Sequence, residues 1–190
     1  MKIASVSTYL PRECGIATFC HSVVNNIAGK SIYEDIEHVI IALNDRGSQH
    51  NYPDDVKYII DEDNHNDYSG AARFINSNAD ICLVQHEFNI YGGDEGCFIL
   101  TLLKELTIPS IVVFHTVYKK PSVVQKFVLQ EISSLTDKIV VISNKAADFC
   151  RTIYKIPDSK IEVINHGIPE ISLNTAESKK ILKLQDRKVI

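Results

Sequence analysis

Polar and ionisable residues follow several short apolar segments of this sequence, and they are the residue types that could carry chemistry. These groups are Arg12–Gly15, Gln85–Gly93, His115–Thr116, Ser143–Asn144 and His166–Gly167. Histidine and glutamate can exchange protons near neutral pH, and a glycine lets the backbone approach a ligand closely. Residues of these types, placed after apolar segments, indicate a site for a small polar molecule.

The first group lies in a loop between the apolar run 3–6 and a segment, 16–28, whose apolar residues recur at helical spacing. The first N–H groups of a helix lack internal partners and carry the positive end of the helix dipole. Gly15 and Ile16 could therefore bind a phosphate or another anion. A simple tight turn explains this loop equally well, and the residues alone leave both readings open.

His115 is the strongest candidate for a catalytic group, because it directly follows the apolar run 110–114. A lone histidine near a core is often structural, but His86 and His166 occupy similar positions after neighbouring runs. Three polar residues beginning at Gln85 are costly to bury unless they are paired or line a cleft.

Tyr91 and the glycines that follow it could form an aromatic wall and turn of the kind that stacks a sugar ring. An ordinary left-handed turn before a helix is the alternative reading for these glycines.

Several common cofactor and nucleophile motifs are absent from the sequence. Gly15 is the only glycine of the first loop, so G-x-G-x-x-G is missing, and Asp45 as a ribose ligand carries little weight without it. The P-loop, the G-x-S-x-G elbow and H-E-x-x-H are also missing. The histidines stand on separate segments, so we expect neither a metal nor a bound cofactor.

Composition predicts an ordinary globular protein of 190 residues, 45% hydrophobic and 23% charged. The net charge of −4 argues against nucleic acid as a partner. Five cysteines without a C-x-x-C pair favour reduced thiols and a cytoplasmic location. No apolar run approaches the length of a membrane span, although peripheral contact with the inner membrane is left open.

Apolar runs alternate with helical patterns along the whole chain. The expected strands are 3–6, 37–43, 56–60, 80–84, 110–114, 138–142 and 160–164, and the expected helices are 16–28, 68–77, 95–106, 122–135 and 145–154. Solidly apolar strands between helices predict an α/β fold with a doubly wound parallel sheet, Rossmann-like. Ligands of such sheets bind at the carboxyl ends of the strands, where the polar groups fall.

We expect a Rossmann-like domain over residues 1–170, and a linker with the start of a further domain over 171–190. The tail is polar, then helical in pattern, and residues 187–190 look like the beginning of a strand. From this we expect that the natural polypeptide continues.

Five motifs taken together resemble the N-terminal domain of GT-B glycosyltransferases of the retaining group 1, family 4. They are Ser7–Phe19, Val84–Gly93, Val113–Thr116, Val141–Ser143 and Ile164–Ile168. The first two are fairly specific to one branch of the family, and the others are looser. The resemblance implies two Rossmann-like domains facing a cleft, the N-terminal one mainly for the acceptor and the C-terminal one for a nucleotide sugar.

The resemblance also implies roles for individual residues. Gly15, with Ile16, would approach the donor phosphates, and His115 would contact the transferred sugar and aid catalysis. The residues expected to line the acceptor side or the cleft are Arg12, His86, Glu87, Tyr91, Ser143 and His166. The implied enzyme is a hexosyltransferase that passes sugar from a nucleotide-sugar donor to a sugar, lipid-linked or polysaccharide acceptor with retention.

One departure from the family pattern bears on activity. The family's paired glutamates, E-x7-E, and its basic phosphate-binding residues belong to the C-terminal domain, and the matching spacing of Glu87 and Glu95 lies in the wrong domain. We therefore expect this chain alone to be inactive. Two alternatives stay open: a non-catalytic module that binds a sugar or phosphate, and a GT-B-like sugar-phosphate epimerase with Glu87 as its acid/base carboxylate.

Overall fold

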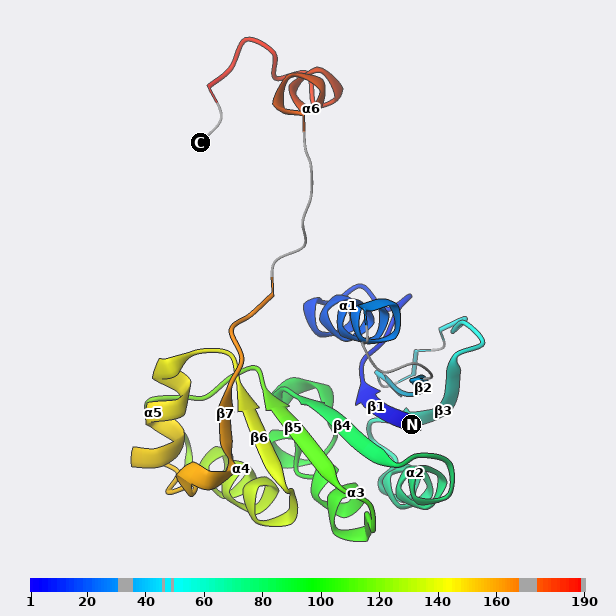
Figure 1. Ribbon diagram of the computed structural model, residues 1–190, viewed down its shortest axis with the longest axis vertical. Helices are drawn as coiled ribbons and strands as arrows, with labels where there is room; N and C mark the ends of the chain where they lie inside the picture. Colours follow the sequence, from blue (N-terminus) through cyan, green and yellow to red (C-terminus); the bar gives the residue numbers. More distant parts are fainter. Residues whose placement is uncertain (31–35, 46, 49, 168–173, 189–190) are drawn as a thin grey trace.

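The computed structural model describes residues 1–30, 36–45, 47–48, 50–167 and 174–188. Within them, seven parallel strands form one sheet in the order β3-β2-β1-β4-β5-β6-β7 (Figure 1). The strands are β1 (Lys2–Ser7), β2 (Glu37–Asn44), β3 (Val56–Asp61), β4 (Ile81–His86), β5 (Ser110–Phe114), β6 (Lys138–Val141) and β7 (Ile161–Val163). The expected α/β fold with a parallel, Rossmann-like sheet is confirmed.

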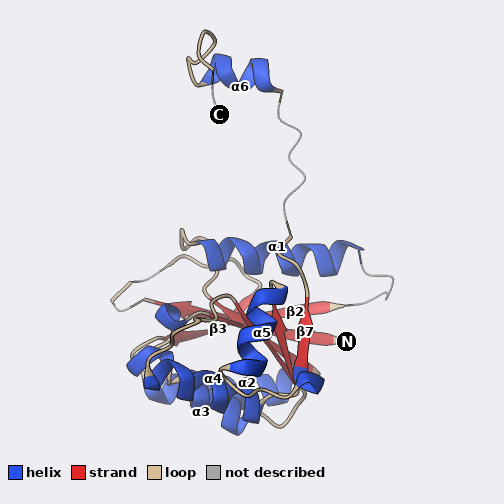
Figure 2. Cartoon of the chain, turned by 90° about the vertical axis from the view of Figure 1, so that its left-hand side faces the viewer, coloured by secondary structure: helices blue, strands red, loops and turns tan. Residues whose placement is uncertain are grey.

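Helices cover both faces of this sheet. They are α1 (Gly15–Lys30), α2 (His65–Asn78), α3 (Ile99–Glu105), α4 (Val123–Leu135), α5 (Asn144–Thr152) and α6 (Thr175–Ile181), with short 3₁₀ turns η1 (Phe88–Ile90), η2 (Asp94–Gly96) and η3 (Asp158–Lys160). Figure 2 shows α1 on one face and α2, α3 and α4 on the other. The α5 helix packs beside β6 and β7 at the sheet edge.

This arrangement follows from the right-handedness of parallel crossovers. The chain runs outward from β1 through α1 to β2, and then pairs β3 at the edge. It returns through α2 to β4 on the other side of β1 and continues outward to β7. Because the direction of travel reverses, the crossovers fall on opposite faces, and the point of reversal lies between β1 and β4.

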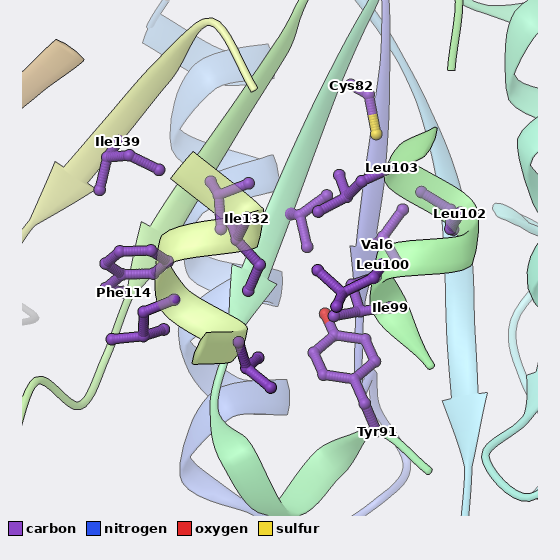
Figure 3. Close-up of a cluster of buried hydrophobic side chains, with 14 of the residues drawn as sticks. Val6, Cys82, Tyr91, Ile99, Leu100, Leu102, Leu103, Phe114, Ile132 and Ile139 are labelled. Atoms are coloured by element: carbon purple, nitrogen blue, oxygen red, sulfur yellow. The ribbon is translucent and has the colours of Figure 1, made fainter. Parts of the chain in front are cut away.

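Alternate residues of the central strands face two separate hydrophobic cores. Ile41 and Leu43 belong to the larger core, under α2, α3 and α4, whereas Ile40 and Ala42 pack with Cys20 of α1. Figure 3 shows part of the larger core, where side chains of the sheet meet those of α3 and α4. Each large apolar side chain buried in this way stabilises the fold by roughly 1.5–3 kcal/mol.

Two of the expected boundaries that differ from the structure lie near the strand ends of interest, and most of the others differ by one to three residues. The strand predicted to end at residue 84 continues to His86, because Gln85 and His86 still pair with Val113 and Phe114 of β5. The helix predicted to begin at residue 95 begins at Ile99. Left-handed backbone at Glu95 (φ 51°) and its glycine neighbours is incompatible with an α-helix there.

The expected domain boundary between residues 170 and 171 falls in 168–173, outside the described residues. Residues 187 and 188 are not part of a strand, and the rest of the strand expected there, 189–190, is also outside the described part. Helix α6 contributes no buried residue. In the described part of the chain, every helix is too short or too polar to cross a lipid bilayer.

Candidate functional site

The carboxyl ends of β1, β4 and β5 meet at one edge of the sheet, on either side of the point where the strand order reverses. Ligands of doubly wound sheets bind in the crevice outside this position. The loop before α1 follows β1, Glu87 follows β4, and His115 follows β5. The fold therefore brings the first three polar groups of the sequence to one edge.

The N-terminus of α1 leaves backbone donors free at this edge. Among the described residues, the N–H groups of Gly15 and Ile16 have no hydrogen-bond partner, whereas the N–H of Ala17 donates to Cys14 Sγ at 3.3 Å. A Cβ added to Gly15 would meet no atom within 4 Å. The Cα of Gly15 thus faces open space, and the helix dipole makes the N-terminus of α1 favourable for an anion.

His115 is held in a defined orientation. Its ring Nε2 lies 2.8 Å from Gln85 Oε1, and its backbone N–H donates to the carbonyl of His86 at 3.1 Å. Burial, and secondarily the charge of His166, lower the pKa of His115 to about 4. The imidazole is therefore neutral at pH 7 and can exchange hydrogen bonds without carrying charge.

Phe19 connects α1 with two of the histidines. Its ring packs edge-on against His115, with centroids 4.8 Å apart and an interplanar angle of 88°, and lies 5.1 Å from the ring of His166. Phe19 stands one helical turn after Gly15 and Ile16. The free donors of α1 and the ring of His115 are thus neighbours in space, although they are far apart in the sequence.

A cavity of about 300 Å³ opens beside His115, between the ends of β5 and β6. Its lining residues are His115, Thr116, Val117, Ile142, Ser143, Lys145, Ala146 and Phe149. Ser143 accepts a hydrogen bond from the N–H of Ala146 at 3.2 Å and is the N-cap of α5. The structure therefore brings His115 and Ser143 together.

Glu87 forms a hydrogen bond between the segments that follow β4 and β5. Its Oε2 accepts a hydrogen bond from Thr116 Oγ1 at 2.6 Å, and its Oε1 accepts one from the N–H of Phe88 at 3.0 Å. Charge-assisted bonds of this kind are among the stronger ones in proteins. Both carboxylate oxygens have partners, so Glu87 links the end of β4 to Thr116, the residue that follows His115.

The side chains of His86 and Tyr91 are buried in the core below the carboxyl ends of the strands and do not line the cavity. They are 0% and 4% exposed, and the His86 ring stacks on Tyr91 with centroids 6.0 Å apart. His86 pairs with Phe114 in the sheet and so points to the face opposite Gln85. Burial, followed by the charge of His115, lowers the pKa of His86 to about 3. Neither side chain offers the ligand surface that was expected of it.

The glycines after Tyr91 have packing roles. A Cβ on Gly92 would overlap the carbonyl oxygen of Glu62, and the Gly92 N–H donates to Tyr68 Oη at 3.0 Å. Gly93 has a left-handed backbone, with φ of 78°. Close packing therefore accounts for Gly92, and the ordinary turn before a helix accounts for Gly93.

Arg12 lies at a different part of the edge from His115. It is paired with Asp45, the residue after β2, at 3.1 Å, and its side chain is 16% exposed. In the strand order, β1 and β4 separate β2 from β5. The structure therefore does not bring Arg12 together with His115 and Ser143, and it engages Asp45 in an ion pair.

Sequence analysis did not assign site roles to Gln85 or Phe19. In the sequence, Gln85 is a polar residue that would be costly to bury and Phe19 is an apolar residue of a helical segment, and both lie within motifs that resemble the family. The spacing of Phe19, one turn after Gly15, could have indicated that it lies near the loop. The bond between Gln85 and His115 depends on strand pairing, which the sequence does not reveal.

Two further observations concern other ligands. A larger cavity, of about 530 Å³, lies at the amino ends of β1, β2 and β3, among Lys2, Glu37, His38 and Lys57. It is at the opposite edge from the strand ends that bind ligands in this fold. In the part of the chain that the structure describes, no group of three histidine, cysteine or acidic side chains could hold a metal ion.

Comparison with known proteins adds a family and a set of similar folds. The family model for Glycosyltransferase Family 4 matches residues 15–170. A search of curated protein sequences gave no significant match. Among solved structures, a glycosyltransferase from Rickettsia africae ESF-5 superposes with a TM-score of 0.60 at 19% identity, covering 97% of this chain and 49% of that one.

An alpha-glucosyltransferase in complex with UDP-glucose and DNA containing an abasic site superposes with a TM-score of 0.58 at 17% identity, covering 89% of this chain and 43% of that one. An alpha-glucosyltransferase (AGT) in complex with UDP superposes with a TM-score of 0.55 at 17% identity, covering 89% of this chain and 44% of that one. This chain thus spans about half the length of these proteins. At such low identities the likeness shows a shared fold, that of the N-terminal half of a GT-B protein.

Proposed function

This chain belongs to Glycosyltransferase Family 4, and on that premise we propose that it is the acceptor-side, N-terminal domain of a sugar-transferring enzyme. The enzyme transfers a hexose from a nucleotide sugar to an acceptor hydroxyl with retention of configuration. One observation carries the proposal: Phe19 joins the free donors of the α1 N-terminus to the neutral ring of His115 at the reversal point of the sheet. A phosphate and the sugar attached to it would lie side by side there.

The N–H groups of Gly15 and Ile16 bind the donor diphosphate in this proposal. When the bond between sugar and phosphate breaks, negative charge grows on the phosphate oxygen that leaves. Fixed donors aimed at that oxygen stabilise the transition state, because they need no reorganisation as the charge develops. The complex of the similarly folded alpha-glucosyltransferase with UDP-glucose supports a nucleoside diphosphate sugar as the donor class.

His115 contacts the transferred sugar. The sugar ring becomes positively charged as the transition state approaches an oxocarbenium ion, so a cation beside it would be unfavourable. Because burial holds the pKa of His115 at about 4, its ring is uncharged at pH 7 and offers a hydrogen bond without that repulsion. The lowered pKa therefore suits the proposed role.

The acceptor approaches from the cavity lined by Thr116 and Ser143. Its hydroxyl groups are small polar groups of the kind that this lining can bind, so we propose a sugar, lipid-linked or polysaccharide acceptor. The DNA of the alpha-glucosyltransferase complex is not carried over, since a net charge of −4 gives no broad attraction for a phosphate backbone. Five free cysteines favour a reducing compartment, and we propose a cytoplasmic enzyme that needs no metal.

The test measures hydrolysis of nucleotide sugars and transfer of their sugar to acceptors, with a panel of UDP-, GDP- and ADP-sugars. It compares the full-length gene product with this chain of 190 residues. We expect activity in the full-length protein, with a product of retained configuration by NMR. His115→Ala should lower kcat by on the order of 100-fold, whereas His65→Ala, a change on the surface of α2, should leave it unchanged.

Two results would contradict the proposal. If the full-length protein binds a nucleotide sugar but transfers it to neither water nor any acceptor, the chain is part of a binding module. If His115→Ala leaves kcat intact in an active enzyme, the histidine has no catalytic role even though the family assignment stands.

A further inference from the structure

Gln85 is buried at the end of β4, and its side chain faces that of His115 across the sheet edge. Its exposed fraction is 0%, and its backbone pairs with Val113 of β5. Since side chains alternate along a strand, His115, two residues after Val113, projects to the same face as Gln85. The contact between the two side chains is therefore a consequence of strand register.

The bond between them selects one tautomer of the imidazole. In this orientation of the amide, Gln85 Oε1 lies 2.8 Å from His115 Nε2, and the amide Nε2 of Gln85 is buried without a hydrogen-bond partner among the described residues. Because an amide oxygen can only accept a hydrogen bond, this orientation puts the ring proton on His115 Nε2. In a neutral ring the other nitrogen, Nδ1, then carries the lone pair. Among the described residues Nδ1 is neither hydrogen-bonded nor buried, so it is the ring atom available to a ligand.

The position of Gln85 is itself fixed by contacts from the core side of the sheet. Tyr91 Oη donates to the carbonyl of Gln85 at 2.6 Å, and Tyr91 stacks with His86 in the larger core. The next carbonyl, that of His86, accepts the backbone N–H of His115. Side chain and backbone thus hold His115 to the same two residues of β4, while Phe19 packs on its ring from α1.

We propose that Gln85 is a positioning residue that holds His115 as the Nε2–H tautomer, with Nδ1 presented as a hydrogen-bond acceptor to a substrate hydroxyl. Its catalytic consequence rests on the proposed glycosyl transfer, but the tautomer does not. A site built in this way favours a sugar hydroxyl that donates to His115. It disfavours a group at that position that can only accept, because two acceptors would then face each other.

The first test is NMR of this 190-residue chain, labelled with ¹⁵N-histidine, at pH 7. The His115 signals are assigned by their loss in His115→Gln. We expect a single Nε2–H tautomer in the wild type. Gln85→Leu, of similar size, should return the ring toward the mixture of tautomers seen in solvated imidazole. An Nδ1–H tautomer in the wild type, or an unchanged pattern in Gln85→Leu, would overturn the proposal.

A second variant separates positioning from packing. Gln85→Glu keeps an acceptor next to Nε2–H and adds a negative charge, which should move the ¹⁵N titration of His115 upward by at least one pH unit. Gln85→Leu cannot produce that upward shift, and neither can Gln130→Leu, a matched control whose amide bonds to the Tyr154 carbonyl instead. A Gln85→Glu titration that coincides with the wild type would contradict the proposal.

Kinetics of the full-length enzyme complete the test. Gln85→Leu should lower kcat by on the order of 10- to 100-fold with little change in KM for the nucleotide sugar. Gln85→Glu should move the acidic limb of the kcat–pH profile upward, in step with the NMR titration. If Gln85→Leu alters the tautomer of His115 but has a normal kcat, the tautomer does not affect catalysis. An inactive wild-type enzyme would instead count against the glycosyl-transfer proposal, and the NMR result would stand.

Discussion

Replacing the buried His86 by phenylalanine should change how the stability of this domain depends on pH. The ring is 0% exposed, lies among Phe88, Tyr91 and Phe114, and has no hydrogen-bond partner for either nitrogen. Phenylalanine keeps an aromatic ring there and removes the titration. His86→Phe therefore tests whether His86 is a neutral supporting group under the site.

The size of the effect follows from the pKa of His86, which burial lowers from 6.5 in the unfolded chain to about 3. Between these values the unfolded state binds one more proton than the folded state. The stabilisation is therefore complete above pH 6.5 and is lost as the pH falls toward 3. The loss is about 1.4 kcal/mol per pH unit, or about 2–3 kcal/mol between pH 6.5 and 4.5.

At pH 7 the variant should be about as stable as the wild type. It no longer buries two unpaired nitrogens, which is a gain of about 1–3 kcal/mol. The larger ring must fit a packed core, which opposes this gain by a similar amount. At pH 4.5 the variant should therefore be more stable than the wild type by about 2–3 kcal/mol.

Urea unfolding followed by circular dichroism at several pH values between 7 and 4.5 measures this difference, since the chain has no tryptophan for fluorescence. His65→Gln is the control, because that side chain is exposed on α2 and should leave the slope with pH unchanged. If wild type and His86→Phe lose stability in parallel, the low pKa and the supporting role of His86 are both wrong.

Three other predictions concern local geometry. Gly15→Ala should keep the unfolding free energy within about 1 kcal/mol, because a Cβ there meets open space, yet weaken nucleotide-sugar binding by the full-length enzyme in calorimetry. Gly92→Ala should lower stability by more than about 2 kcal/mol, because its Cβ would overlap a backbone carbonyl; equal stability of the two variants would contradict this. Ser122→Ala should remove about 1 kcal/mol, because it destroys the capping box at the start of α4, whereas Ser134→Ala, on the exposed surface of that helix, should not.

The sequence alone was sufficient to predict the helices and strands and the edge of the sheet where the candidate site lies. Apolar runs and helical spacing are local signals, and they predicted strand β5 with the same bounds, 110–114, as the structure has. The choice of His115 followed from the rule that parallel sheets bind ligands at the carboxyl ends of their strands.

The tertiary structure alone decided which polar neighbours face the site. Gln85 and His86 are adjacent in the sequence, yet one bonds to His115 and the other is enclosed in the core. A strand buried on both faces has no polar–apolar alternation to reveal its orientation, so only its pairing with β5 assigns each side chain to a face. The same pairing engages the carboxylate of Glu87 with Thr116, which no spacing in the sequence could indicate.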